Sequence, residues 1–297
     1  MNETTKSVFV AVIGRPNVGK SSLLNRLVGE KVAIVTDKPQ TTRTRITGIL
    51  TQQAVQYVFI DTPGFHKPRT RLGGRMNQTV KDAVSQGDAV AMLFEPKPGF
   101  TPEENEMIES LGSFDSVAVV NKTDIFAADD VKKKLEEIKD LGKFSSVLAT
   151  SAENGDGCTE LLNILQSFAI DGPHFFPQDA YTDLPEKQLV AEIIREKLLR
   201  HLQQELPHGI AVEVERFNER EDKPLIEIDA NIYCEKKSHK GMIIGKQGQM
   251  LKTISSEARR DCEEMLDTRV NLKCWVKVKE GWRDNEFLLN NLGFRKQ

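Results

Sequence analysis

Short apolar runs alternate with longer amphipathic stretches over residues 7–168. The runs lie at 8–13, 57–60, 90–94, 117–120 and 147–149, and each ends in loop residues. Such alternation is typical of a largely parallel sheet with helices on both faces. A sixth run, at 46–50, precedes residue 57 by too few residues for a crossover helix, so it predicts an antiparallel pair with 57–60. We therefore expect an α/β domain with a six-stranded, mostly parallel sheet.

The alternation stops between residues 170 and 184. Pro173 and Pro177 stand there among Asp and Gly residues, with Pro185 just beyond, and proline and glycine interrupt regular structure. We therefore expect a first domain at 1–170, a linker at 171–185 and a second domain at 186–297.

The second domain has a different order of elements. Residues 186–206 predict a helix with Val190, Ile194, Leu198 and Leu202 on one face. The pattern then predicts strands at 210–214 and 225–233, two helices that flank residues 245–248 and end near 262, a strand at 270–278 and a short helix at 286–292. The order helix, strand, strand, helix, helix, strand indicates a smaller α+β domain.

Composition limits the class of protein. The chain has 297 residues, of which 39% are hydrophobic and 29% charged, as in a globular protein of about two domains. Its formal net charge of -3 argues against bulk electrostatic binding of nucleic acid, so a nucleic-acid site must be local. The four cysteines are far apart and no apolar run reaches 18 residues. We expect a cytoplasmic protein in a reducing compartment.

A candidate phosphate-binding loop follows the run at 8–13. Residues 14–21 match GxxxxGK[ST] between a predicted strand and a predicted helix. Backbone N–H groups in such a loop turn toward phosphates, Lys20 would contact the β and γ oxygens, and the Ser21 hydroxyl would ligate Mg²⁺. The expected nucleotide-binding residues here are Gly14, Arg15, Pro16, Asn17, Val18, Gly19, Lys20, Ser21 and Ser22.

A candidate base-binding loop, Asn121-Lys122-Thr123-Asp124, follows the run at 117–120, at the strand end where α/β sheets bind ligands. The Asp124 carboxylate can accept from the N1–H and the exocyclic amine of guanine, whereas adenine would leave it unpaired. We expect Lys122 to lie along the base and Asn121 to tie this loop to the phosphate loop. After Ser151, the Ala152 N–H could bond the guanine oxygen. The sequence thus predicts GTP rather than ATP.

Two further segments complete the expected nucleotide site. In Asp61-Thr62-Pro63-Gly64, Asp61 would hold Mg²⁺ through water and the Gly64 N–H would face the γ-phosphate. In the connection at 38–43, a threonine should reach Mg²⁺ when a γ-phosphate is present. We expect Thr42 in this role, with Thr41 as the alternative, so the expected metal set is Ser21, Thr42 and Asp61.

These segments, in this order, resemble the translation-factor-related class of GTPases. Ras-like enzymes place after the equivalent glycine a glutamine that orients the attacking water, but Phe65 stands here. Phenylalanine cannot orient water. The resemblance therefore implies a hydrophobic-substituted GTPase with slow intrinsic hydrolysis, and it leaves the catalytic residue unassigned.

Residues 243–248, Ile-Ile-Gly-Lys-Gln-Gly, resemble the GxxG loop of a type II KH domain. Two glycines let the backbone approach a sugar-phosphate chain, so that about four nucleotides of single strand can be clamped beside an apolar wall. Residues 236–260 carry seven Lys and Arg against one acidic residue. The expected RNA-binding residues are Ile243, Ile244, Gly245, Lys246, Gln247, Gly248, Lys236, Lys240 and Lys252. We expect Trp275 to pack in its strand and Trp282 to cover the sheet edge.

The combination resembles the bacterial Era GTPase family over nearly the whole chain, including residues 174–183, 192–197 and 275–282. The resemblance implies a GTP-switched factor in maturation of the small (30S) ribosomal subunit that binds single-stranded 16S rRNA near its 3′ end. It implies GTP or GDP and Mg²⁺ as ligands, a monomer, and peripheral contact with the inner membrane. A γ-phosphate that orders residues 38–43 could reorient the KH domain, which requires different RNA affinities in the two nucleotide states.

Two alternatives compete with this interpretation. A GTPase whose second domain docks on a protein partner or on an anionic membrane would use the same lysine cluster. A ribosome-assembly GTPase with two GTPase domains also carries a KH-like tail, but this sequence has one phosphate loop and an intact GxxG.

Overall fold

The computed structural model describes residues 4–38, 41–65, 70–203, 206–292 and 294. The chain divides into two compact units. The first comprises Met1–Ala33, Thr42–Arg69 and Gly73–Asp183, and the second comprises Ile34–Thr41, Thr70–Leu72 and Leu184–Gln297. Two short segments from the first half of the sequence therefore belong to the second unit.

The sheet of the first unit has the order β2-β3-β1-β4-β5-β6 within the described residues. Its strands are β1 (Lys6–Gly14), β2 (Ile46–Gln52), β3 (Val55–Asp61), β4 (Ala89–Phe94), β5 (Ser116–Val120) and β6 (Ser146–Ala149). All neighbours on this path are parallel except β2 and β3, which are antiparallel. The predicted sheet is confirmed, including its antiparallel pair. A two-residue strand, β7 (Ile170–Asp171), spans the predicted boundary between the first domain and the linker and pairs with the start of β1.

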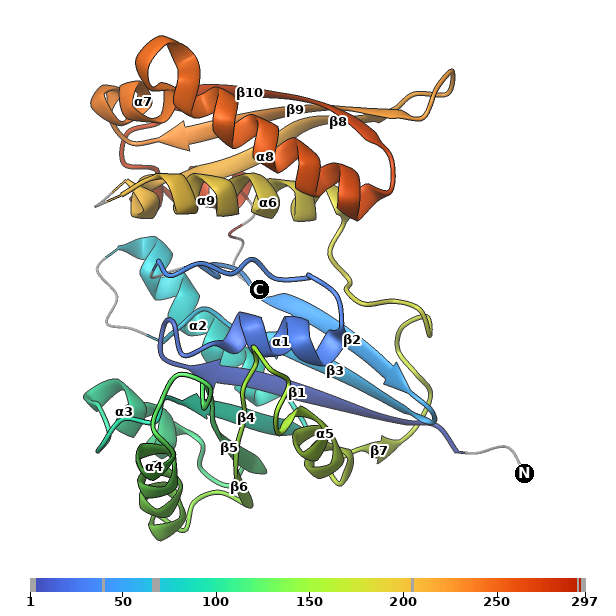
Figure 1. The fold of residues 1–297 in the computed structure, drawn as a ribbon, viewed down its shortest axis with the longest axis vertical. Helices are drawn as coiled ribbons and strands as arrows, with labels where there is room; N and C mark the ends of the chain where they lie inside the picture. The colour runs from blue at the N-terminus through green and yellow to red at the C-terminus, as the bar shows by residue number, and fades with distance from the viewer. Residues whose placement is uncertain (1–3, 39–40, 66–69, 204–205, 293, 295–297) are drawn as a thin grey trace. The chain divides into compact units, whose positions relative to one another are not determined.

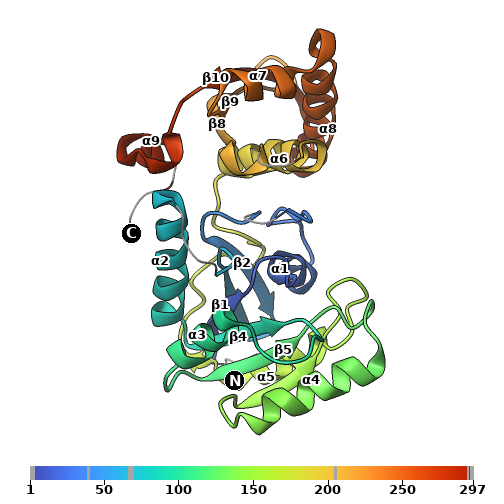
Figure 2. The same ribbon diagram turned by 90° about the vertical axis from the view of Figure 1, so that its left-hand side faces the viewer.

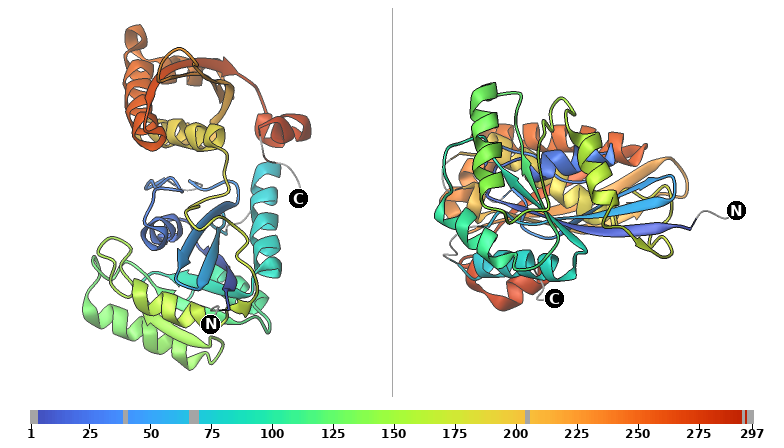
Figure 3. Two further views of the ribbon diagram at one scale, coloured as in Figure 1. Left: turned by 90° about the vertical axis from the view of Figure 1, so that its right-hand side faces the viewer. Right: turned by 90° about the horizontal axis from the view of Figure 1, so that it is seen from below.

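Helices cover both faces of this sheet, as Figure 1 and the left view of Figure 3 show for α1 and α2. The helices are α1 (Lys20–Val28), α2 (Arg71–Gln86), α3 (Pro102–Ser110), α4 (Ala128–Asp140) and α5 (Cys158–Gln166). A core of buried residues from the sheet and from α2, α3 and α4 includes Ile60, Val80, Met92 and Ile138. Because both faces are covered, β3 is buried along its whole length, which explains why its residues 57–60 are apolar without alternation.

Parallel strands end at one edge of their sheet, and open α/β sheets bind ligands there. The four predicted nucleotide motifs, at residues 14–21, 61–64, 121–124 and 151–152, lie at the ends of β1, β3, β5 and β6. The topology therefore gathers motifs that are distant in sequence.

The second unit has the predicted order of elements (Figure 2). They are α6 (Glu186–His201), β8 (Ala211–Glu219), β9 (Leu225–Cys234), α7 (Lys237–Ile244), α8 (Gln249–Leu266), β10 (Arg269–Val278) and α9 (Glu286–Asn291). β9 pairs antiparallel with β8 and parallel with β10. The predicted apolar face of α6 is buried in a core with Ile228 and Ile254, but α6 ends at His201 rather than at Leu206, because Leu202 is extended.

The two tryptophans occupy different environments. Trp282 is fully buried, and its Nε1–H donates to the Gly209 carbonyl at 2.9 Å. Trp275 lies on β10 with 44% of its surface exposed. It is therefore more exposed than we expected for a side chain packed within the strand. Trp282 therefore holds the end of the chain to the turn before β8, whereas Trp275 adds little to the core.

We expect Trp282→Ala to lower the free energy of unfolding of the second unit by about 3–5 kcal/mol, because it removes a buried indole and leaves a carbonyl unpaired. Trp275→Ala, the matched control, should cost less than about 1 kcal/mol. Urea unfolding followed by circular dichroism measures both. Equal losses for the two variants would contradict the assignment of Trp282 to the core.

Candidate functional site

The phosphate loop runs from β1 into α1 and depends on two glycines. Gly14 has φ +148°, and a Cβ there would lie 2.8 Å from the Leu93 carbonyl oxygen. Gly19 has φ +100°, and its Cβ would lie 2.2 Å from Nδ2 of Asn121. Only glycine fits either position. Because α1 begins at Lys20, directly after the loop, its first N–H groups face the place where phosphates bind in such loops.

Lys20, the first residue of α1, is a buried cation. Its Nζ donates to the carbonyl oxygens of Gly14 at 3.1 Å and Arg15 at 3.0 Å. Burial lowers the pKa of Lys20 to about 8, although the negative charge of Asp61 opposes this shift. A phosphate group would favour the charged amine, so the lysine is adapted to an anionic ligand.

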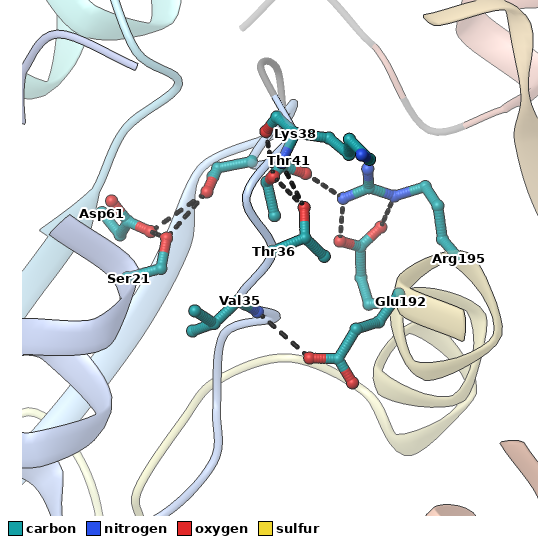
Figure 4. Close-up of polar contacts among 10 residues, drawn as sticks. Ser21, Val35, Thr36, Lys38, Thr41, Asp61, Glu192 and Arg195 are labelled. Carbon is teal, nitrogen blue, oxygen red and sulfur yellow. Dashed lines mark hydrogen bonds and ion pairs between the residues drawn. The ribbon is translucent and has the colours of Figure 1, made fainter. Parts of the chain in front are cut away.

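Three oxygen-bearing side chains, those of Ser21, Thr42 and Asp61, meet next to the phosphate loop, and Figure 4 labels Ser21 and Asp61 among them. The Ser21 hydroxyl donates to Asp61 Oδ2 at 2.6 Å and lies 2.9 Å from Thr42 Oγ1, which is 3.3 Å from the same carboxylate oxygen. Burial raises the pKa of Asp61, opposed by Lys20 and the two hydroxyls. The other oxygen, Oδ1, is buried and accepts no hydrogen bond within the described chain. Hydroxyl and carboxylate oxygens are the donors that Mg²⁺ prefers, so this set fits Mg²⁺.

The two candidate threonines point to different partners. Thr41 Oγ1 donates to the Lys38 carbonyl and lies 2.7 Å from Thr36 Oγ1, whereas Thr42 contacts Ser21 and Asp61. The geometry thus favours Thr42 as the expected metal ligand. Pro39 and Gln40, which belong to the predicted segment 38–43, lie outside the described residues.

Asn121 connects three loops of the site. It is fully buried, and its Nδ2 donates to the Val18 carbonyl at 3.0 Å. Its Oδ1 accepts from the Thr150 hydroxyl at 3.1 Å and from the Ala152 N–H at 3.2 Å. The N–H that we expected to meet guanine is therefore bonded to Asn121 here. Thr150, which directly precedes Ser151, was not identified from the sequence.

Asp124 is exposed, and the Ser151 hydroxyl donates to its Oδ1 at 2.7 Å. Lys122 has φ +69°, and its Nζ donates to Glu95 Oε1 at 2.7 Å. Burial alone would raise the pKa of Glu95, but hydrogen bonds from Lys122 and Lys97 lower it below its usual value. Glu95 was not predicted from the sequence, although it directly follows β4 and polar residues at strand ends marked the other motifs.

The loop after β3 closes against the phosphate loop. The Thr62 hydroxyl donates to the Val12 carbonyl at 2.8 Å, and Pro63 follows. A Cβ on Gly64 would lie 2.6 Å from the Pro16 nitrogen, so glycine is needed for this close approach. Phe65 is 8% exposed and packs in the core of the first unit. Its ring is therefore unable to position water at the nucleotide.

The glycine loop of the second unit joins α7 to α8. Gly245, Gln247 and Gly248 all have positive φ, at 73°, 51° and 78°. A Cβ on Gly245 would lie 2.6 Å from Cβ of Met250, so only glycine fits there. Lys246 and Gln247 are exposed at the tip of the loop. This backbone is open to a ligand from outside.

Lysines surround the glycine loop. Lys236, Lys240, Lys246 and Lys252 are exposed, and none of them forms an ion pair with another described residue. Their charge is thus available to an anionic partner.

The apolar wall beside the loop differs from our expectation. Ile243 is fully buried in the core, so its side chain cannot contact RNA, and that expectation is wrong. Ile244 is half-buried. Met242, which we did not predict, is 56% exposed and presents the apolar surface on this helix.

No helix in the described parts of the chain combines the length and apolar character that a membrane span requires.

Two family models match the chain. The model described as 50S ribosome-binding GTPase matches residues 9–122, and the model described as KH domain matches residues 205–283. Among curated proteins, GTPase Era of Caldanaerobacter subterraneus subsp. tengcongensis is 48% identical, over 96% of this chain and 97% of its own length. GTPase Era of Clostridioides difficile is 43% identical, over 97% and 98%.

Two solved structures are similar over both units. An Aquifex aeolicus Era variant bound to GDP and aluminium fluoride aligns with a TM-score of 0.94 and 33% identity, over 98% of this chain and 100% of its own. The same values hold for Era in complex with MgGDPNP and nucleotides 1506–1542 of 16S ribosomal RNA.

The lowered pKa of Lys20 makes GDP binding depend on pH. With a pKa of about 8, about half of the Lys20 amines are uncharged at pH 8 and about a tenth at pH 7. Because the phosphates favour the charged form, we expect proton uptake to rise from about 0.1 to about 0.5 per GDP between these values. Calorimetry in buffers of different ionisation enthalpy measures the uptake.

The control for this measurement is Lys20→Arg, whose guanidinium stays charged and should show no rise. Uptake by the unmodified chain that does not increase from pH 7 to pH 8 would contradict the role of Lys20.

Proposed function

The chain belongs to the GTPase Era family, and we propose that it is a GTP-dependent switch that binds the 3′ region of 16S rRNA during maturation of the 30S subunit. The contact of Ser21, Thr42 and Asp61 beside Lys20 carries this proposal, because it prepares a magnesium and γ-phosphate site. The solved Era complex with MgGDPNP and nucleotides 1506–1542 of 16S ribosomal RNA supports the RNA target. We assign the GTPase function to residues 1–170, and RNA binding to 186–297.

We assign the nucleotide contacts to the four loops at one edge of the large sheet. Lys20 and the α1 N-terminus would hold the phosphates, Asp124 would read guanine, and Asn121 would hold the loops in register. Ser21 and Thr42 would ligate Mg²⁺ and Asp61 would hold it through water. When bound, Mg²⁺ neutralises charge that develops between the β- and γ-phosphates during hydrolysis.

We expect intrinsic hydrolysis to be slow. Phe65 is packed in the core at the place where a glutamine would orient the attacking water in Ras-like enzymes. Without such a side chain, catalysis depends on the charges around the phosphates alone.

The features of the second unit fit an RNA ligand better than they fit a membrane or a protein partner. Attraction to anionic lipid needs only charge, whereas Gly245, Gln247 and Gly248 shape the backbone with positive φ as close contact with a sugar-phosphate chain requires. The family resemblance alone predicts peripheral contact with the inner membrane and a monomeric state, which vesicle binding and light scattering measure.

Asp124→Asn should change nucleotide specificity. The amide would present a donor to the guanine amine, so we expect GDP affinity to fall about a hundredfold, while xanthosine diphosphate, which has a carbonyl at that position, should gain affinity. Competition against a fluorescent nucleotide measures both. Asp129→Asn, an exposed carboxylate on α4, is the control and should change neither. Loss of both nucleotides in Asp124→Asn would argue against direct base recognition.

Lys246→Glu should weaken RNA binding. The matched control, Lys133→Glu, makes the same charge change at an exposed position on α4. With a single-stranded oligonucleotide of the 16S 3′ end at fixed salt, we expect Lys246→Glu to lose about tenfold or more, and to reduce the salt dependence of binding. Lys133→Glu should bind as the unmodified chain does.

The comparison is made with GDP and with a non-hydrolysable GTP analogue, against a scrambled oligonucleotide. Tighter binding of the authentic sequence in the analogue state alone would support both the RNA target and the switch. Equal and weak binding of both sequences in both states would contradict them. In that case, binding to anionic vesicles would favour the membrane interpretation. Light scattering on the same sample measures whether the chain is a monomer.

A further inference from the structure

The segment Ile34–Thr41 belongs to the same compact unit as α6, although it leads directly into Thr42 of the first unit. Two groups on α6 hold it (Figure 4). Near its start, the Val35 N–H donates to Glu196 Oε1 at 3.2 Å. At its end, the Thr41 carbonyl accepts from Nη2 of Arg195. The segment is therefore fixed near both ends by consecutive residues of one helix.

The α6 groups are charged and buried. Arg195 is 3% exposed and Glu196 is fully buried. Glu192 accepts from two nitrogens of the guanidinium, Nε at 2.9 Å and Nη2. Arg200 donates to Glu196 at 3.0 Å. Buried ion pairs seldom stabilise a fold more than apolar residues would, and a positional role is a better account of them. The core of this unit is itself apolar.

The Arg195 guanidinium has one hydrogen-bond donor that no described residue accepts from. Nη1 of Arg195 is buried and has no hydrogen-bond partner among the described residues. Buried donors are almost always paired. Nη1 is therefore able to donate a hydrogen bond to a further oxygen when the segment is rearranged.

A hydrogen bond to the Thr41 carbonyl also acts on Thr42. The carbonyl of residue 41 and the nitrogen of residue 42 share one planar peptide group, and the two Cα atoms are about 3.8 Å apart. Fixing the carbonyl thus fixes the direction in which the Thr42 backbone leaves. Thr42 in turn places its hydroxyl 2.9 Å from Ser21 Oγ.

We propose that Arg195, oriented by Glu192, is a positioning residue for Thr42, so that a helix of the RNA-binding unit sets the geometry of the γ-phosphate and magnesium site. This inference rests on the proposed function, because it needs Thr42 as the ligand of the triphosphate state. Arg195 touches neither nucleotide nor metal; it acts through one peptide group. GDP binding, which does not engage Thr42, is independent of it.

The test measures affinities for GDP and for a non-hydrolysable GTP analogue in Mg²⁺, with the full chain. We expect Arg195→Met to weaken the analogue about tenfold and to change GDP by less than about twofold. Arg195→Lys, which keeps the charge but not the planar fork, should give an intermediate loss. The matched control is Lys187→Met: Lys187 also lies on α6, but its Nζ donates to the Glu215 carbonyl at 3.4 Å, and its loss should leave the ratio of the two affinities unchanged.

A double-mutant cycle separates positioning from mere structure. If Arg195 acts through Thr42, Arg195→Met should add little to the loss caused by Thr42→Ala. Additive losses, or equal losses of GDP and analogue affinity, would overturn the proposal. If Thr42→Ala itself leaves analogue affinity unchanged, the proposed function is wrong at that residue. If Thr42→Ala lowers the affinity for the analogue but Arg195→Met leaves the ratio of GDP to analogue affinity unchanged, only this inference is wrong.

Discussion

One buried amide holds the nucleotide site in register. Asn121 uses its nitrogen for the Val18 carbonyl and its oxygen for Thr150 and Ala152, so the loops after β1, β5 and β6 are tied to a single side chain. The bonds to Val18 and Thr150 are buried, and an unmet partner in such a place costs about 1–3 kcal/mol. The amide also explains Gly19, since any Cβ there would collide with Nδ2. The base-reading and phosphate-binding parts of the site are therefore one structure rather than two.

Around that amide, the chain places charges where a fold alone would avoid them. Lys20 and Asp61 are buried, and burial shifts the pKa of each toward its uncharged form. Such shifts gather at functional sites, because the missing stabilisation is supplied by a ligand. A phosphate beside Lys20 and a cation beside Asp61 would each restore the charged form. The cost of burying these groups is thus part of the affinity for a magnesium nucleotide.

The features that could be predicted from the sequence are those that depend on the local pattern of residues. The strands and the antiparallel pair follow from apolar runs and loop lengths, and the phosphate loop follows from residues whose spacing is fixed by backbone geometry. Prediction from the sequence failed where tertiary packing determines the environment of a side chain. The short helix α7 is apolar on more than one side, so sequence alone could not show that Ile243 faces the core and Met242 faces solvent. The two residues of β7 carry too little pattern to be recognised, and Arg195 meets a partner 154 residues away.

The bond between Arg195 and Thr41 limits how strongly the nucleotide could act on the second unit by this route. A hydrogen bond from a charged donor contributes about 1.5–3 kcal/mol, which corresponds to a change in affinity of about 10- to 150-fold. Allosteric couplings in proteins cover the same range. Linkage makes this coupling reciprocal. If a triphosphate changes the affinity of the second unit for a ligand that alters α6, that ligand changes the affinity of the first unit for the triphosphate by the same factor. One guanidinium on one peptide group is therefore sufficient for a switch of ordinary strength, and a larger coupling would require contacts beyond it.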